Sequence, residues 1–262
     1  MKDILDLERY PIDRLQSADG QSLIARCKAD LAGDGMFNLE GLVQPDVIAH
    51  CAAELQPRLD RESYTHKRSH NVYFLRNVAG LSPDHPALRQ IETVHHTLCA
   101  DQVRDSVVTR LYEWSPFVEF LALVMERPKL HVMEDPLARV NVIAYRAGEA
   151  LNWHFDRSQF TTTLLIQAPA AGGEFQYRRD LRSDADPNYD GVARLLRGED
   201  EAVRSLTLQP GTLNVFKGKN TLHRIAPPAG GRDRIVAIFS YYDQPGVVFS
   251  ETERVGFYGR AK

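Results

Sequence analysis

Hydrophobic positions change their spacing near the middle of the chain, and this change divides the sequence into two regions. In the first ~130 residues apolar side chains recur at helical spacing, so this region is predicted to be mostly helical. The last predicted helix is expected to break or kink at Pro116, because proline has no backbone donor for the helical ladder. The predicted helices cover residues 17–32, 45–59, 86–100 and 106–126.

Other parts of this first region follow a different pattern. Residues 35–43 alternate apolar and polar positions, as a short strand does. Residues 61–81 are polar, basic and aromatic without a clean period, so we interpret them as a long loop with a short strand at 72–74. His95 and His96 fall in the predicted helix 86–100, where they would point in different directions as surface or capping residues.

From residue 138 the chain consists of short runs rich in Val, Ile, Thr, Phe and Tyr, separated by Gly and Pro. This pattern is typical of an antiparallel barrel or jelly roll. The charged residues 180–204 interrupt it, and we predict a surface insertion with one short helix there. The β-rich runs cover residues 138–149, 160–168, 173–179, 205–218, 221–227 and 234–243.

The two regions are predicted to form a single domain of the α+β class, because no linker separates them. Its core would be a double-stranded β-helix, a cupin-like jelly roll, at residues 131–245. Residues 1–130 would buttress this core with helices. Residues 246–262 are predicted to form a short capped helix with an aromatic end, which is a candidate lid over the site.

The overall composition is ordinary for a soluble protein. Of the 262 residues, 43% are hydrophobic and 26% are charged, and the formal net charge is -3, so no basic field suggests nucleic acid as a partner. No apolar run is long enough to cross a bilayer, and the start of the sequence lacks an apolar signal core. The cysteines at positions 27, 51 and 99 lie far apart, which suits a reducing cytoplasm. We therefore expect a cytoplasmic monomer or homodimer with a small-molecule substrate.

The first candidate for chemistry is the pair His154 and Asp156 in the run WHFDR. Side chains at i and i+2 of a strand point to the same face, so the two can aim at one point. An imidazole and a carboxylate are two-thirds of the 2-His-1-carboxylate set that holds non-haem Fe(II). Alone the pair is a weak signal, because a chain with nine histidines often contains such a pair by chance.

His223 and Arg234 strengthen this interpretation. His223 lies on a β-rich run near the end of the predicted barrel and supplies a second histidine. Arg234 begins the next run, and a guanidinium can bind a carboxylate through two parallel hydrogen bonds, which suits a dicarboxylate co-substrate. The alternatives are unrelated core or surface histidines, and for Arg234 a surface charge at the start of a strand.

With these residues in this order, the chain resembles the Fe(II)/2-oxoglutarate-dependent dioxygenases. The resemblance covers about residues 139–242. It implies that His154, Asp156 and His223 bind iron and that Arg234 holds the far carboxylate of 2-oxoglutarate. Fe(II), 2-oxoglutarate and O2 are the cofactor and co-substrates that it implies.

A narrower resemblance comes from the runs LNWHFDRSQFTTTLLIQAPAAGGEFQY and FYGR. They look like a bacterial group of stand-alone hydroxylases and halogenases that act on free amino acids and similar metabolites. The halogenases have glycine in place of the carboxylate ligand, and chloride fills that place. This chain has Asp156, so it resembles the hydroxylating members. It departs from the pattern at Val236, where serine is frequent, and at Asp233, which is unusual beside the arginine.

Four more residues are candidates for contact with the co-substrate. Asn141 and Tyr145 share a face of the predicted strand before the motif, since they are i and i+4. Thr161 and Thr163 share a face directly after it. The alternative for each is packing in the core or at an edge, and threonine is common in strands.

Substrate contacts are expected from loops around the mouth of the barrel. Arg76 is the candidate for a substrate carboxylate, and Glu134 with Asp135 for an ammonium group. Arg157 would need a turn to point inward, and Tyr258 would belong to the lid. The alternatives are solvated loop charges and, for Tyr258, a packed terminal aromatic ring.

The predicted function is hydroxylation of an unactivated C–H bond of a free amino acid or a similar small carboxylated metabolite. The same cofactor chemistry serves desaturation, cyclisation and epimerisation, and a peptide or natural-product intermediate is an alternative substrate. A metal-binding barrel without catalysis is less favoured, because a pure metal site does not need a carboxylate clamp such as Arg234.

Overall fold

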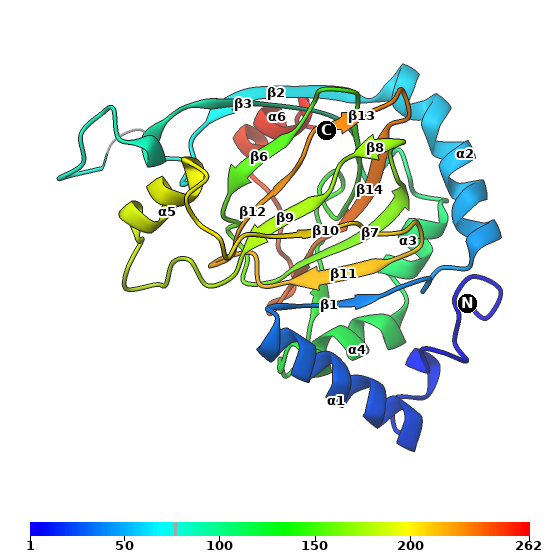
Figure 1. Ribbon diagram of the computed structural model, residues 1–262. Helices are drawn as coiled ribbons and strands as arrows, with labels where there is room; N and C mark the ends of the chain where they lie inside the picture. Colours follow the sequence, from blue (N-terminus) through cyan, green and yellow to red (C-terminus); the bar gives the residue numbers. More distant parts are fainter. Residues whose placement is uncertain (76–77) are drawn as a thin grey trace.

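Two antiparallel sheets pack against each other in the computed structural model, which describes residues 1–75 and 78–262 (Figure 1). The larger sheet has the strand order β1 (Met36–Leu39), β11 (Leu213–Phe216), β7 (Thr161–Gln167), β14 (Arg234–Phe239), β5 (Val140–Tyr145), β3 (Ile91–Leu98) and β2 (Tyr64–His70). The smaller sheet has the order β10 (Arg204–Leu206), β9 (Phe175–Arg178), β12 (Leu222–Ile225) and β6 (Leu151–His154). Two short pairs add β13 (Pro228–Ala229) with β8 (Ala171–Gly172), and β15 (Tyr241–Tyr242) with β4 (His131–Val132).

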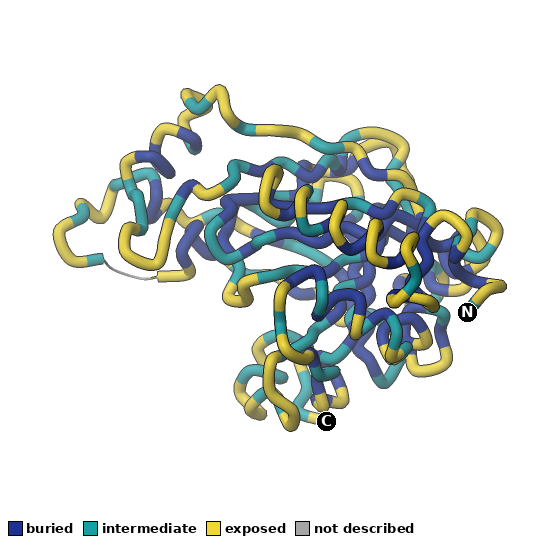
Figure 2. Tube along the Cα trace, turned by 90° about the horizontal axis from the view of Figure 1, so that it is seen from below, coloured by how far each residue is buried: buried dark blue, intermediate teal, exposed yellow. Residues whose placement is uncertain are grey.

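Helices cover the outer face of the larger sheet. They are α1 (Ala18–Gly33), α2 (Pro45–Glu62), α3 (Val107–Tyr112) and α4 (Ser115–Val124). The remaining helices are η1 (Ile12–Arg14), η2 (Pro86–Leu88), α5 (Tyr189–Leu196) between β9 and β10, and α6 (Glu251–Tyr258) near the C-terminus. Figure 2 shows the centre of the molecule as mostly buried, with exposed residues on the helices and loops around it. The predicted combination of helices and antiparallel sheets is therefore confirmed.

Strand alternation gives the larger sheet two different faces. On β14, Ile235 and Ala237 join the main hydrophobic core under the helices. Val236, between them, packs with Ile143 and Tyr145 of β5 on the opposite side, where Leu151 of the smaller sheet meets them. We call this opposite side the inner face, and Arg234 lies on it because it is two residues before Val236.

The predicted helix at 86–100 is wrong. Only η2 forms a helical turn there, and β3 follows it. The β-branched residues Ile91, Thr93, Val94 and Thr97 explain the difference, since branching at Cβ favours an extended backbone.

The interpretation of residues 61–81 is also wrong in part. β2 begins at Tyr64 and pairs with β3 along its whole length, whereas no strand forms at 72–74. These two strands extend the larger sheet beyond β5, so the first half of the chain contributes to the inner face as well as to the helical support. The predicted break near Pro116 is confirmed, because α3 ends at Tyr112 and α4 begins at Ser115 with the proline in its first turn.

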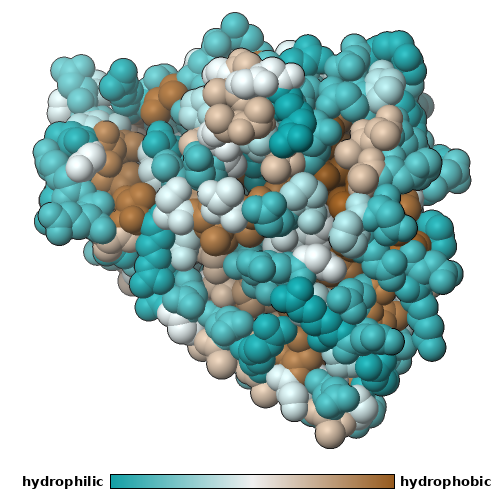
Figure 3. Space-filling view, turned by 45° about the vertical axis from the view of Figure 1, so that its right-hand side comes forward, coloured by the Kyte–Doolittle hydropathy of each residue, from teal (hydrophilic) through white to brown (hydrophobic). Residues whose placement is uncertain are grey.

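The surface is polar over most of the face shown in Figure 3, where apolar side chains lie in small groups among hydrophilic ones. Among the residues that the structure describes, none of the helices combines the length and the apolar character needed to cross a membrane.

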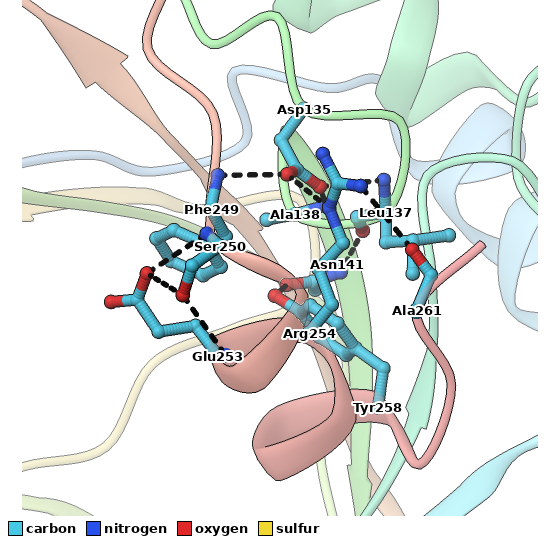
Figure 4. Close-up of polar contacts among 10 residues, drawn as sticks. All are labelled: Asp135, Leu137, Ala138, Asn141, Phe249, Ser250, Glu253, Arg254, Tyr258 and Ala261. Atoms are coloured by element: carbon cyan, nitrogen blue, oxygen red, sulfur yellow. Dashed lines mark hydrogen bonds and ion pairs between the residues drawn. The ribbon is translucent and has the colours of Figure 1, made fainter.

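The C-terminal helix α6 is held by an ion pair between a buried carboxylate and a partly buried arginine (Figure 4). Arg254 Nε donates to Asp135 Oδ2 at 2.8 Å, and Asp135 is 0% exposed. The same carboxylate accepts hydrogen bonds of 2.9 Å from the backbone N–H groups of Leu137, Ala138 and Phe249. Burial alone would raise the pKa of Asp135, but the hydrogen bonds from Arg254 and the three amides outweigh it and lower that pKa.

We expect Asp135→Asn to lower the free energy of unfolding by about 3 kcal/mol at pH 7, because it leaves the Arg254 guanidinium without its charged partner. A carboxyl group whose pKa is lower in the folded state than in the unfolded state stabilises the fold at pH values above its unfolded-state pKa. This stabilisation is lost as the pH falls through the folded-state pKa. The difference between the wild type and the variant should therefore shrink below pH 3.8, the ordinary value for this carboxyl. Urea unfolding of both proteins at pH 7 and at several acidic pH values measures this difference in the free energy of unfolding.

The control for this prediction is Asp101→Asn, at another carboxylate that pairs with an arginine of the C-terminal segment. The side chains of Asp101 and Arg260 are 30% and 36% exposed, so water screens their interaction. We expect this variant to lose about 0–1 kcal/mol. Equal losses in the two variants would contradict the anchoring role of Asp135.

Candidate active site

His154 and His223 lie opposite each other on two neighbouring strands of the smaller sheet. His154 is the last residue of β6, and it pairs in register with His223 on β12. Asp156 lies just beyond the strand, where its backbone N–H donates to Gly218 O at 3.1 Å. The strand therefore ends before the carboxylate, and the turn after β6 directs Asp156 toward the histidines.

The three side chains converge on one point. His154 Nε2 lies 3.3 Å from Asp156 Oδ1, and His223 Nε2 lies 3.4 Å from Asp156 Oδ2. One ligand atom from each residue lies within 4.8 Å of the other two. Both histidines are buried, and the Asp156 side chain is 19% exposed, so the carboxylate is the part of the group open to a small molecule.

Hydrogen bonds set which nitrogen of each imidazole faces this point. His154 Nδ1 lies 2.7 Å from Asn152 O, and His223 Nδ1 lies 2.9 Å from Thr221 O. A carbonyl oxygen only accepts, so Nδ1 carries the proton in both rings and a neutral ring has its lone pair on Nε2. Two lone pairs and a carboxylate then face one another, an arrangement that a bound cation stabilises.

The pKa values agree with this arrangement. Burial and the neighbouring His223 lower the pKa of His154, which favours the neutral ring. Burial would raise the pKa of Asp156, but His223 and His154 hold it well below its usual value. Thr161 Oγ1 donates to Asp156 Oδ2 at 2.5 Å and orients the carboxylate. Neutral imidazoles and an ionised carboxylate are the forms that bind a metal, and the set fits iron.

Gly218 is required by the close approach of its backbone to this carboxylate. A Cβ at position 218 would overlap with Asp156 Oδ2 and lie 2.8 Å from Thr161 Oγ1. We expect Gly218→Ala to displace the carboxylate and to weaken Fe(II) binding about 10- to 100-fold, as changes beside metal ligands do. Calorimetric titration with Fe(II) under anaerobic conditions measures the affinity.

The matched control is Gly33→Ala, because a Cβ at position 33 meets nothing within 4 Å. This variant should bind Fe(II) as the wild type does. If Gly218→Ala also kept its full affinity, the packing of Gly218 against Asp156 would have no part in metal binding.

Arg234 lies on the inner face opposite Tyr145 of β5. It is 4% exposed, its Nε donates to Gly173 O at 3.1 Å, and its Nη1 has no hydrogen-bond partner among the described residues. Burial lowers the pKa of Arg234 to about 10, and the Tyr145 hydroxyl works against this shift. A buried guanidinium with an unused donor fits a carboxylate ligand such as one end of 2-oxoglutarate.

A protein-family comparison bears on this arrangement. The model of the family described as "HalD: Halogenase D" matches residues 19–247, which include the triad and Arg234. The chain belongs to the halogenase D family. A comparison with curated sequences found no match.

Solved structures share the fold of this halogenase D family member. An oxidoreductase of the 2OG-Fe(II) oxygenase family from Burkholderia pseudomallei has 14% identity and a TM-score of 0.51, with 85% of this chain and 92% of that chain covered. The epimerase SnoN in complex with Fe3+, alpha ketoglutarate and nogalamycin RO has 14% identity and a TM-score of 0.54, with 85% and 84% covered. HygX from Streptomyces hygroscopicus with nickel and 2-oxoglutarate bound has 12% identity and a TM-score of 0.55, with 82% and 85% covered.

Three other residues of this halogenase D family member are predicted to contact the co-substrate, and they have different surroundings. Tyr145 is buried near Asp156 and Arg234, and burial raises its pKa while Arg234 opposes the shift. Asn141 lies further along the same face of β5 and accepts a hydrogen bond of 2.9 Å from the Tyr258 hydroxyl. Thr163 Oγ1 donates to the backbone of β11, at Asn214 O, over 3.4 Å. Their contact with 2-oxoglutarate stays a prediction.

The residues predicted to contact the substrate also differ in their surroundings. Arg76 lies outside the described residues. Glu134 accepts a hydrogen bond from Gly246 N at 3.1 Å, and the Arg157 side chain is 79% exposed with its Nη1 3.4 Å from Glu253 Oε1 on α6. Asp135 is fully occupied by Arg254 and the amides, so its proposed contact with a substrate ammonium is wrong.

Two features of the site are absent from the sequence-based prediction: the approach of Gly218 to the carboxylate, and the hydrogen bond from Thr161 to it. The available signal for Gly218 was its place between two β-rich runs just before His223, where a turn must bring the chain back. No pattern in the sequence indicates that this turn touches Asp156, because the contact joins two turns that lie far apart along the chain.

Proposed function

We propose that the protein is an Fe(II)- and 2-oxoglutarate-dependent oxygenase that hydroxylates an unactivated C–H bond of a small carboxylated metabolite, such as a free amino acid. The observation that carries the proposal is the triad itself. Its hydrogen bonds place two unprotonated imidazole nitrogens and a carboxylate around one point. Membership of the halogenase D family and the iron and 2-oxoglutarate bound in related folds support the same chemistry.

We also infer that the two sheets form a double-stranded β-helix. The inner faces of β1 and β11 pack against β9 and β12 around Phe175 and Phe216, as the two sheets of a jelly roll do. Both rings also contact His223, with centroids 5.7 and 4.8 Å from its imidazole. These aromatic walls would exclude water from one side of the metal site.

Each residue would have a separate part in the reaction. His154, Asp156 and His223 would hold the iron. Arg234 would bind the far carboxylate of 2-oxoglutarate and so orient its other end toward the metal. Bound there, iron with 2-oxoglutarate and O2 supplies the oxidising power to break an unactivated C–H bond. Thr161 would keep Asp156 aligned as a ligand.

Halogenation is the second candidate, and the family description favours it. Hydroxylation is preferred because Asp156 stands where a halogenase of the resembling group has glycine and binds chloride. Asp156→Gly in the presence of chloride tests this distinction. A chlorinated product from the variant but not from the wild type would support the role of Asp156 in excluding halide.

The deciding experiment uses protein loaded with Fe(II) under anaerobic conditions. 2-Oxoglutarate, ascorbate, O2, chloride and a panel of free amino acids are added, and succinate and product masses are followed. We expect succinate together with a gain of one oxygen. A loss of two hydrogens would indicate desaturation or cyclisation, and a chlorinated product from the wild type would indicate halogenation. No succinate with any substrate and no visible band on adding 2-oxoglutarate would overturn the oxygenase proposal.

A further inference from the structure

A second polar group lies on the inner face of β2 and β3, next to α6. His66 of β2 pairs in register with His95 of β3, and their rings stack at 4.8 Å. Phe257 of α6 lies 6.1 Å beyond His66, and Tyr145 lies 5.9 Å beyond His95. This row of four rings runs from the C-terminal helix to the tyrosine beside Arg234.

The surroundings of the two histidines in this row favour their neutral forms. Burial lowers the pKa of His95 to about 3, with His66 contributing, and burial and Arg68 lower the pKa of His66. His95 Nδ1 is buried and has no hydrogen-bond partner among the described residues. A buried polar atom without a partner costs free energy unless a ligand or water satisfies it.

Arg68 lies two residues after His66, so its side chain points to the same face. Its guanidinium carbon lies 4.7 Å from the ring of Phe74 and 5.7 Å from the ring of Phe257. Within residues 1–75 and 78–262 no carboxylate pairs with it, and burial together with the like charge of Arg157 lowers the pKa of Arg68. The preceding residue, Lys67, points to the opposite face and pairs with Glu92 at 3.2 Å.

Phe74 connects this arginine to the triad. Its ring lies 6.1 Å from that of His154 and 4.6 Å from that of His70. Asn71 holds the loop in place, because its Oδ1 accepts hydrogen bonds of 3.1 Å from Tyr73 N and Leu75 N. The Phe74 ring therefore lies close both to the Arg68 guanidinium and to the imidazole of His154, so a small molecule beside this ring can reach both groups.

We propose that Arg68, between the rings of Phe74 and Phe257, binds a carboxylate of the substrate and directs the rest of the molecule toward the triad. A planar guanidinium offers two parallel donors to a carboxylate, and the rings of Phe74 and Phe257 lie on either hand of this guanidinium and limit its positions. His66 and His95 add neutral hydrogen-bonding groups beside it without adding charge. The proposal rests on the oxygenase function above and names a carboxylate as the group that the substrate must carry.

The test compares free amino acids with their C-terminal amides. Protein loaded anaerobically with Fe(II) and 2-oxoglutarate is titrated with each probe, and the shift of the metal-to-ligand absorption band gives the Kd. In the wild type we expect the amides to bind about 10- to 100-fold more weakly than the acids, as loss of a charged hydrogen bond implies. Arg68→Gln should remove this preference, while the concentration of 2-oxoglutarate needed to form the band stays the same.

Two further variants complete the test. Lys67→Gln changes a cation on the other face of the same strand and should keep the full preference for acids. Arg68→Lys keeps the charge without the planar fork and should restore part of the preference, which separates loss of binding from loss of folding.

The outcomes distinguish this inference from the proposed function. If the band forms but the wild type has no preference for acids, or responds to no acid, Arg68 is not a carboxylate clamp. A preference that persists in Arg68→Gln overturns the inference in the same way. If no band forms in the wild type, the oxygenase function itself fails.

Discussion

Asp156→Ala is expected to abolish the oxidation of 2-oxoglutarate and the modification of any substrate. Asp156 is the one anionic member of the triad, and its oxygens lie 3.3 and 3.4 Å from the two imidazole nitrogens. Without it, two neutral imidazoles remain, and we expect Fe(II) affinity to fall more than about 100-fold, beyond the effect of changes next to metal ligands. Calorimetric titration with Fe(II) and the succinate assay measure the two losses separately.

Asp184→Ala is the matched control for this result. The Asp184 side chain is 72% exposed and pairs with Lys219 at 2.7 Å, so its loss changes an acidic residue on the surface. Its iron affinity and succinate formation should equal those of the wild type. If Asp156→Ala kept full activity, another carboxylate would have to be the ligand.

Arg234→Gln is expected to weaken 2-oxoglutarate binding about 100-fold, because two charge-assisted hydrogen bonds to a buried carboxylate are lost. The unused Nη1 and the burial of Arg234 make this loss larger than at a surface arginine. Titration of the anaerobic Fe(II) protein with 2-oxoglutarate, followed at the visible band, gives the affinity. Fe(II) binding without 2-oxoglutarate should stay unchanged, which separates this residue from the triad.

Arg232→Gln and Arg234→Lys sharpen this prediction. Arg232 is exposed and donates to Pro169 O at 3.3 Å, so its variant should keep wild-type affinity. The lysine variant keeps the positive charge but not the fork, and an intermediate affinity is expected. A loss in Arg232→Gln with none in Arg234→Gln would move the clamp to Arg232.

The candidate metal site could be predicted from the sequence, because only a few residue types, among them histidine and aspartate, bind iron. His154 and Asp156 lie two positions apart, and His223 follows on a β-rich run, so spacing and strand pattern together indicated that they could meet. The reason was only partly right, since β6 ends at His154 and a turn positions Asp156. Arg234 was found in the same way, at the start of β14.

The rest of the site depends on contacts between distant parts of the chain. The sequence IETVHHTL lies in the helix predicted at 86–100, although its β-branched residues form β3 once β5 and β2 are beside it. The helix predicted at 86–100 hides His95, and the loop predicted at 61–81 hides His66 and Arg68, because strand alternation in β2 and β3 is what brings the three to one face. The overlap that a side chain at Gly218 would have with Asp156 is likewise a property of two turns that meet in space.

The ion pair of Asp135 and Arg254 fixes the C-terminal segment before any ligand binds. It docks α6 against β5, and Phe257 and Tyr258 take their places beside Arg68 and Asn141 as the chain folds. The conformational entropy of this segment is thus lost on folding and does not oppose the binding of a ligand. A small molecule that enters beside α6 therefore meets a preorganised wall, and its affinity depends mainly on the contacts it makes there.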